Sequence, residues 1–387
     1  VVPEARKLDA ISFDEMLELA SVGARVMHSR SIEFAKKFGV PVHVRSSFSD
    51  ADGTWILPAS PAMEQVPVCG VAMDKDEARI TIVEVPDSPE TLHQIFSDVA
   101  ERNLVVDMIV QNIPTDGKTQ ISFTVMRGEL HEALRSVEEA AKEAGAGQVR
   151  YEDNVSKVSI VGAGMRIHTG VANRMFSALA AEHINIKMVS TSEIKISVLV
   201  DRDRAVEALR AVHRAFQLDE PRTAQEASYI SESLAQTRRR EMSLRDESLA
   251  AVVERLPSME AIVVNAVQAD TTQARVTVFN VPDRPGIAAR VFQRIAEANV
   301  MVDMIVQNVS TEGYTHISFT VPRDQAERAE RQVNAVAREL GGTAAVDSNI
   351  AKITVAGVGM RTHTGVAARI FDALEKARVP VHMINTS

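Results

Sequence analysis

The sequence has a single cysteine, Cys69, and this scarcity excludes several classes of protein. One thiol forms no disulfide within the chain and builds no cysteine-based metal site, as expected in a reducing cytoplasm. No run of about 18 apolar residues is present to span a bilayer, and residues 1–8 have no apolar core of a secretory signal behind them. We therefore expect a cytosolic protein that is not a membrane protein.

Aromatic residues and positive charge are also scarce. Phe, Trp and Tyr make up only 4% of the 387 residues, so aliphatic side chains must fill the core. Lys and Arg number 43 against 52 Asp and Glu, which gives a formal net charge of −9. This balance provides no overall basic field for phosphates, so nucleic acid is not an expected partner. The length fits two or three domains of roughly 150 residues each.

One segment of the sequence occurs twice. Asp-Met-Ile-Val-Gln-Asn occupies residues 107–112 and again 303–308, an offset of 196 residues (303 minus 107). Gly-x-Gly-Met-Arg at 162–166 returns at 357–361 with an offset of 195. Such self-similarity indicates a duplicated structural unit. We call residues 68–219 the first unit and residues 260–387 the second unit.

Each unit alternates predicted strands and helices. In the first unit the order strand, helix, strand, strand, helix, strand is typical of the split βαβ, or ferredoxin-like, module. Two modules per unit predict four in the chain and an α+β fold class. Apolar periodicity predicts strands at 79–85, 105–111, 120–125, 157–161, 186–189 and 195–200, and helices at 90–102, 130–144 and 171–182.

Two further regions lie outside this repeat. Residues 220–259 are polar and favour a connecting helix, whose Arg238–Arg240 run is better explained as a solvated face than as a phosphate patch. Residues 1–57 predict helices at 13–22 and 31–38 and a strand at 40–44. They are typical of the closing part of an α/β domain.

A glycine-rich turn follows the predicted strand at 157–161. Gly162 and Gly164 resemble the start of a dinucleotide fingerprint, but Ile167 stands where the third glycine is required. We instead expect a tight strand-to-helix turn whose exposed amides can hold a small carboxylate. His168 and His363 follow the glycines in both units without partner ligands nearby, so a structural or helix-capping role is favoured over metal binding.

An Asp-x-Pro motif between a strand and a helix also recurs, followed by a strand that ends in Gln-Asn. Helix N-terminal amides favour an anion, and Asp87 or Asp283 can pair with an ammonium group. Together they suit a free amino acid. From one copy the alternative, that the aspartate merely caps the helix, is equally open.

Three segments carry a resemblance to a known family. Residues 7–30 (KLDAISFDEMLELASVGARVMHSR) and 40–48 (VPVHVRSSF) resemble the end of the catalytic domain of aspartate kinases. The rest, including 190–198 (STSEIKISV), is similar to the paired ACT regulatory domains of that family, and the duplication is similar to its four-ACT subset. The resemblance implies an incomplete amino-acid-kinase domain (1–57), four ACT domains (67–148, 149–219, 260–343 and a truncated 344–387) and a helical linker (220–259).

The resemblance also implies an activity. The parent protein would phosphorylate L-aspartate to 4-phospho-L-aspartate with Mg-ATP, opening the synthesis of lysine, threonine and methionine. The family's catalytic segments would precede Val1, so we expect no catalytic residue, no metal site, no bound cofactor and no turnover from residues 1–387 alone. Arg25 corresponds to a phosphate-contacting lysine, or else is a surface arginine. The alternative is a non-catalytic ACT subunit that binds amino acids and a separate catalytic chain.

The same resemblance predicts where lysine and/or threonine bind as effectors. One composite site combines both units, and a second is weaker because Glu90, Pro114, Pro380 and Val381 replace favourable residues. Unpaired sheet edges further predict a homodimer or higher homo-oligomer, or pairing of the units within the chain. The predicted effector residues are Asp283, Pro285, Gly286, Ala288, Asp303, Gln307, Ser310, Asn185, Ile186, Ser192 and Glu193, with Asp87, Asp107, Gln111 and Ser387 in the weaker site.

Overall fold

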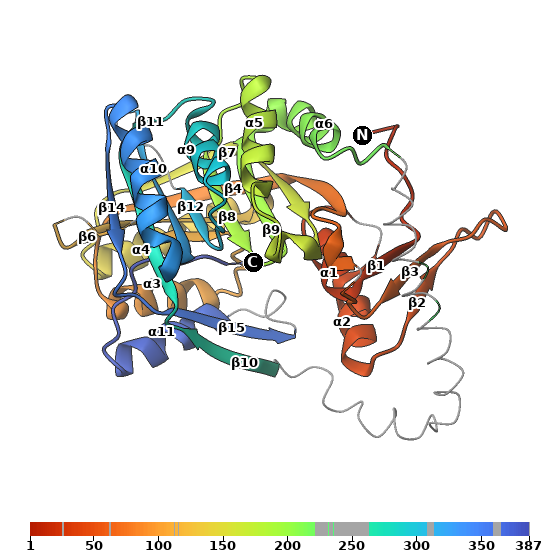
Figure 1. Ribbon diagram of the computed structural model, residues 1–387. Helices are drawn as coiled ribbons and strands as arrows, with labels where there is room; N and C mark the ends of the chain where they lie inside the picture. Colours follow the sequence, from red (N-terminus) through yellow and green to blue (C-terminus); the bar gives the residue numbers. More distant parts are fainter. Residues whose placement is uncertain are drawn as a thin grey trace.

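The computed structural model is a mixed α/β structure in which helices surround a large central sheet (Figure 1). The connecting helix expected over 220–259 lies, apart from residues 220, 231 and 235, outside the described residues, as do Arg25, Ser310, His363 and Ser387. Among the described residues no helix is both long and apolar enough to cross a bilayer. The described residues are 1–24, 27–61, 63–111, 113–114, 116–220, 231, 235, 263–307, 313–358 and 365–386.

Residues 1–57 form a layer with its own sheet. Its elements are β1 (Ala10–Ser12), α1 (Phe13–Ser21), α2 (Ser29–Phe38), β2 (Val42–Val44) and β3 (Thr54–Leu57). Both predicted helices are present, and β3, which the sequence pattern did not indicate, lies between β1 and β2 and runs parallel to β1. Met16 and Leu19 of α1 share a buried core with Ala72 and Val161, which fixes this layer to the first unit.

The first unit follows the predicted order of strands and helices. Its helices bury the faces expected from their periodicity; the apolar positions Leu92, Ile95, Phe96 and Val99 are all buried. The elements are β4 (Gly70–Pro86), α3 (Pro89–Glu101), β5 (Ile109–Gln111), β6 (Lys118–Met126), α4 (Leu130–Glu143), β7 (Val149–Val161), α5 (Val171–Ala181), β8 (Met188–Ser192), β9 (Lys195–Asp201) and α6 (Ala205–Ala215).

Two strands of the first unit are longer than predicted. β4 pairs through residues 70–74 with the second half of β7, and through residues 77–82 with its first half. The strands expected at 79–85 and 157–161 therefore begin earlier in the chain than predicted. Each of them is long enough to take part in two successive groups of elements. β5 is shorter than expected and covers only three residues.

The second unit repeats these elements with a break. In place of the continuous β4 and β7 it has two pairs of shorter strands, and β10 and β15 form a separate two-stranded sheet. α11 packs against α3 of the first unit, with the Phe96 and Phe371 rings 5.2 Å apart. The elements are β10 (Val263–Asp270), β11 (Gln273–Pro282), α9 (Ile287–Glu297), β12 (Ile305–Gln307), β13 (Tyr314–Pro322), α10 (Ala326–Glu339), β14 (Thr343–Asp347), β15 (Lys352–Val358) and α11 (Val366–Lys376).

The two units share one ten-stranded sheet. Its order is β14-β11-β13-β12-β8-β9-β7-β4-β6-β5, and the units meet where Gln307 of β12 pairs with Val189 of β8. Of the two expected forms of pairing, the structure therefore contains the one within a chain. β8 begins at Met188 rather than at Ile186. The Asn185 side chain and the Ile186 carbonyl instead form hydrogen bonds with the second unit across this junction.

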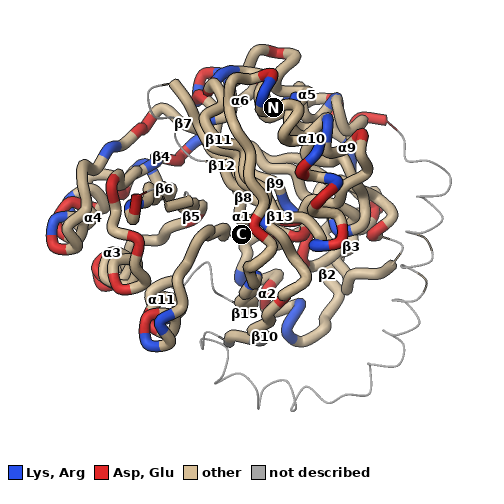
Figure 2. The backbone as a smooth tube through the Cα atoms, turned by 60° about the vertical axis from the view of Figure 1, so that its left-hand side comes forward, with Lys and Arg blue, Asp and Glu red and all other residues tan. Residues whose placement is uncertain are grey.

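The far end of the sheet curves back toward this junction. Val110 of β5 and the preceding Met108 lie in a buried cluster with Met188, Leu199 and Val306 of the central strands. Figure 2 shows few charged residues along the central strands, whereas α3, α4 and α11 on the outside are rich in them. The strands near the centre thus carry few charged residues, and most of their side chains are buried.

Candidate functional site

Five predicted effector residues from the two units meet beside the β8–β12 junction. Asn185 Nδ2 donates to Asp283 Oδ1 at 3.1 Å, and Gln307 Nε2 donates to the Ile186 carbonyl at 3.2 Å. Gly286 lies three residues after Asp283, at the start of α9. We call Asn185, Ile186, Asp283, Gly286 and Gln307 the Gln307 cluster. The structure brings them together within one chain.

The helix start in this cluster is open. Gly286 is the N-cap of α9 with φ +91°, a left-handed conformation that favours glycine, and within the described residues no side chain caps this helix. The idea that Asp283 merely caps the helix is therefore wrong, since its carboxylate bonds Asn185 instead. Uncapped amides and the helix dipole favour an anion at this end.

A buried acceptor completes the cluster. Gln307 is 5% exposed, and its Oε1 has no hydrogen-bond donor among the described residues. Leaving such an atom unsatisfied costs about 1–3 kcal/mol, and an ammonium donor would remove that cost. With the Asp283 carboxylate and the open helix start, the cluster offers groups for both charges of a free amino acid.

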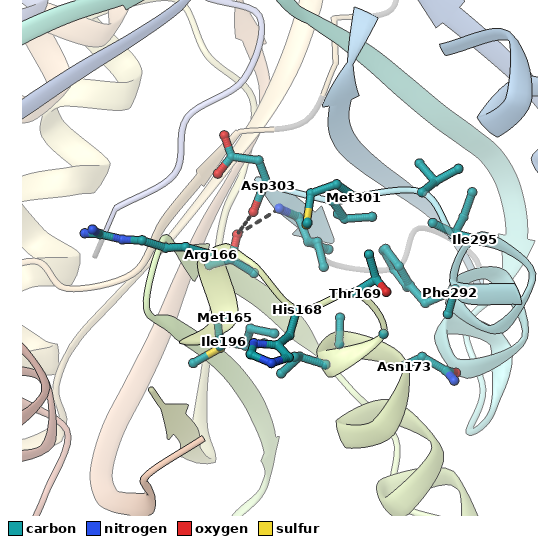
Figure 3. Close-up of a pocket in the computed structure, with 18 of the residues that line it drawn as sticks. Met165, Arg166, His168, Thr169, Asn173, Ile196, Phe292, Ile295, Met301 and Asp303 are labelled. Carbon is teal, nitrogen blue, oxygen red and sulfur yellow. Dashed lines mark hydrogen bonds between the residues drawn. The ribbon is translucent and has the colours of Figure 1, made fainter. Parts of the chain in front are cut away.

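A pocket of about 340 Å³ lies at the same interface of the units (Figure 3). The first unit contributes residues 165–173 and 191–196, and the second contributes α9 and residues 300–305. Phe292, Ile295 and Met301 form an apolar wall, and His168 and Thr169 project from the opposite unit. We call this cavity the interface pocket. It combines an apolar wall with polar groups, as small-molecule sites do.

Charged groups stand at the polar side of the interface pocket. Arg166 pairs with Glu193 at 2.8 Å, and Lys352 pairs with Asp303. The Arg166–Glu193 pair is half exposed and therefore contributes at most about 1 kcal/mol, so a ligand can replace either partner at little cost. The Oε1 of Gln273, another lining residue, has no donor among the described residues.

The predicted effector residues are thus divided between two places. Ser192, Glu193 and Asp303 line the interface pocket and not the Gln307 cluster. Ala288 is buried in the first turn of α9. The aromatic and methionine residues of the pocket were missed because they have ordinary core periodicity. A signal was present in Gly170, which starts α5 uncapped by any described side chain, as Gly286 starts α9.

Two residues predicted for the weaker site, Asp87 and Gln111, lie near a helix start of a different kind. Gln111 Nε2 donates to the Val381 carbonyl at 3.1 Å, and the Gln111 Oε1, in a side chain 1% exposed, has no donor among the described residues. Ser88 caps α3 by accepting from the Thr91 amide. Burial raises the pKa of the Asp87 carboxyl, while nearby His382 opposes this shift. We call Asp87, Gln111, Val381 and His382 the Gln111 cluster.

Asp107, also predicted for the weaker site, is used differently. Its carboxylate pairs with the buried ammonium of Lys157, which also contacts Glu77 at 2.5 Å. Burial alone would lower the pKa of Lys157, but the two carboxylates more than offset it, so this pKa lies above its ordinary value. Asp107 is therefore part of a structural ion cluster beside β5.

The glycine turn holds a carboxylate that belongs to the chain itself. The Ala163 amide donates to Glu15 Oε1 at 2.9 Å, and Glu15 Oε2 also closes a capping box with Ser12. A Cβ at Gly162 would lie 2.3 Å from the Pro67 carbonyl oxygen, which explains this glycine. His168 Nδ1 contacts the Gly164 carbonyl, and the described residues contain no cluster of three potential metal ligands.

Comparisons with known proteins agree with this arrangement. Residues 158–216, 279–336 and 353–387 match the ACT domain family, and residues 1–46 match the amino acid kinase family. The chain is 48% identical over 222 residues to an aspartate kinase of Stutzerimonas stutzeri, covering 57% of this chain and 54% of that protein. An aspartokinase of Pseudomonas aeruginosa is also 48% identical over 223 residues, with the same coverage.

A solved structure covers the whole chain. The aspartate kinase of Synechocystis is similar with a TM-score of 0.72 and 32% identity, over 100% of this chain and 64% of that one. The chain spans about half the length of the curated relatives it matches, namely 54%. With an amino-acid-kinase segment followed by ACT domains and with these relatives, the chain is similar to aspartate kinases over its whole length.

Proposed function

We propose that the whole protein is an aspartate kinase that transfers the γ-phosphoryl group of Mg-ATP to the side-chain carboxylate of L-aspartate. The family match of residues 1–46 and the relatives at 48% identity support this. By the same resemblance it would act in the synthesis of lysine, threonine and methionine. Aspartate-dependent ADP release by the full-length gene product tests the activity; a full-length product without it would instead be a non-catalytic ACT subunit.

We further propose that residues 67–148, 149–219, 260–343 and 344–387 are four ACT domains. The family model covers parts of the last three. The first has the same element order, from β4 to the first half of β7, and packs α3 against α11 of the fourth as α5 packs against α9. Residues 1–57 would then be the end of the kinase domain, and Arg25 a nucleotide-binding residue there.

The regulatory function we propose is binding of lysine and/or threonine at the interface of the units. The observation that carries it is the buried Gln307 Oε1 without a described donor, beside Asp283 and the open start of α9. The effector's ammonium would bond Gln307 and Asp283, and its carboxylate the α9 amides. The interface pocket supports a second amino acid, whose ammonium would face Asp303 or Glu193.

Calorimetric titration of the chain with L-lysine and with L-threonine tests this regulation. We expect saturable binding of at least one of them. L-norleucine, which has the carbon chain of lysine without its side-chain ammonium group, should not bind if the lysine charge is recognised. Absence of heat with both effectors would overturn the proposal. A relative from Clostridium acetobutylicum, with a TM-score of 0.51 and 25% identity, is described as an allosteric enzyme, which fits this expectation.

We also propose self-association. Within the described chain β14 pairs only with β11, so its other edge is available to another strand. A homodimer or higher homo-oligomer through the ACT domains would cover such edges. Sedimentation velocity of the chain should show more than one protomer per particle, and a monomer at micromolar concentration would contradict this.

A further inference from the structure

Two equivalent threonines make the same contacts at opposite interfaces. Thr191 donates to the Asp303 carbonyl at 3.3 Å and accepts from the Ile305 amide at 2.8 Å. Thr386, which is 195 residues later, donates to the Asp107 carbonyl at 2.5 Å and accepts from the Ile109 amide at 2.9 Å. The two threonines therefore make equivalent hydrogen bonds. Thr191 joins β8 to β12 and the residues before it, and Thr386 joins the carboxyl-terminal segment to β5.

Asn385 links these two sets of threonine hydrogen bonds. Its Oδ1 accepts from the Ser190 hydroxyl and from the Thr191 amide at 3.2 Å. Its Nδ2 donates to the Thr191 carbonyl and to Thr191 Oγ1 at 3.1 Å. On its other side Asn385 forms a backbone bridge with Val110 of β5. One side-chain amide thus makes four hydrogen bonds with β8 while its backbone contacts β5.

The resulting chain of contacts begins at a ligand-sized cavity. Thr191 and Asp303 both line the interface pocket, and dashed lines in Figure 3 mark the bonds of the Thr191 hydroxyl with the Asp303 carbonyl and the Ile305 amide. From Thr191 the contacts lead through Asn385 and Thr386 to Ile109, two residues before Gln111. Neither Asn385 nor Thr386 lines the pocket. The described end of the chain lies at the centre of the molecule (Figure 1), where such a link is possible.

We propose that Asn385 couples the interface pocket to β5, so that a ligand in the pocket stabilises the contact between Thr386 and Ile109. A ligand that orders Thr191 and Asp303 also fixes the Asn385 amide, which cannot rotate without breaking all four of its bonds. Coupling is reciprocal, so loosening β5 must equally loosen the pocket. This rests on the proposed function only for the identity of the ligand.

The experiment measures hydrogen exchange of peptides that contain Ile109 and Ile305, because both amides donate into this chain of contacts. The variants are Asn385→Ala and Thr386→Val, which break the link, and Thr386→Ser, which keeps the hydroxyl as a matched control. The probe is L-lysine or L-threonine, whichever binds by calorimetry. We expect saturating ligand to slow exchange at Ile109 about five-fold or more in the unmodified chain and in Thr386→Ser.

In Asn385→Ala and Thr386→Val the ligand should still bind and protect Ile305, without protecting Ile109. Equal protection of Ile109 in Asn385→Ala, or none in the unmodified chain despite binding, would overturn the coupling. A second arm uses no ligand: Thr386→Val should speed exchange at Ile305 by at least two-fold, and Thr386→Ser should not. If neither amino acid binds, the proposed regulation fails, while this second arm still decides the coupling.

Discussion

The two units start from nearly the same sequence and build two different interfaces. In the Gln307 cluster α9 starts at an uncapped glycine and Asp283 is held by Asn185, whereas in the Gln111 cluster Ser88 caps α3. Both clusters contain a buried glutamine whose Oε1 has no donor among the described residues. The buried acceptor occurs in both copies and the uncapped helix start in only one, so a duplicated fold need not give two equal sites.

The units also differ in the strands that link their two successive groups of elements. In the first unit β4 and β7 are continuous and enclose Lys157, which is 2% exposed, between Glu77 and Asp107. In the second unit the strands break, and the equivalent Lys352 is less deeply buried and pairs with Asp303.

The largest expected effect concerns these two lysines. Lys157→Met should destabilise the chain by about 3–5 kcal/mol, because the buried Glu77 and the partly buried Asp107 would both lose their cation. Lys352→Met should cost roughly 1 kcal/mol, as for a more exposed pair. Urea unfolding of the ligand-free variants measures both. Equal shifts of the urea midpoint would show that continuity of β4 and β7 does not distinguish the units.

The second effect concerns effector binding. Gln307→Ala should weaken binding about ten-fold or more, because losing a hydrogen bond to a charged group costs roughly 1.5–3 kcal/mol. Asn185→Ala should act similarly by releasing Asp283. Gln111→Ala should change binding little, which makes it the matched control. Calorimetry with L-lysine and L-threonine gives the dissociation constants, and equal losses from Gln111→Ala and Gln307→Ala would mean that the sites are not specialised.

A smaller effect is pH-dependent and belongs to the Gln111 cluster. Burial raises the pKa of Asp87 in the folded chain, so the folded state binds this proton more tightly than the unfolded state does. The carboxyl therefore reduces stability as the pH rises above the usual Asp pKa of about 3.9. Asp87→Asn should raise the free energy of unfolding at pH 7 by about 0.5 kcal/mol or less, seen as a higher melting temperature, and should not do so at pH 3.5. A gain at both pH values would exclude titration as its cause.

Much of the interface was predictable because the repeat restricts which residues are equivalent. The offset of 196 residues aligned Gln111 with Gln307 and Asp87 with Asp283, and the resemblance then paired 283–310 with 185–193. Local periodicity could not show that β4 and β7 each serve two groups of elements, since it does not reveal a strand's partners. Nor could it find the bond between Glu15 and Ala163, which joins residues 148 positions apart.

The smallest expected effect tests the helix starts directly. Ser88→Gly removes the hydroxyl that accepts from the Thr91 amide and should lower stability by only a few tenths of a kcal/mol, because glycine is itself a tolerated N-cap. It leaves the α3 amides open, as those of α9 are. The double variant Ser88→Gly/Glu90→Gly also removes the acidic side chain in the first turn of α3. If the Gln111 cluster lacks an open helix start, this double variant should add a second, weaker binding event in calorimetry. A double variant of normal stability that still shows the original stoichiometry would place the difference between the two clusters elsewhere, in Val381 and His382 rather than in α3.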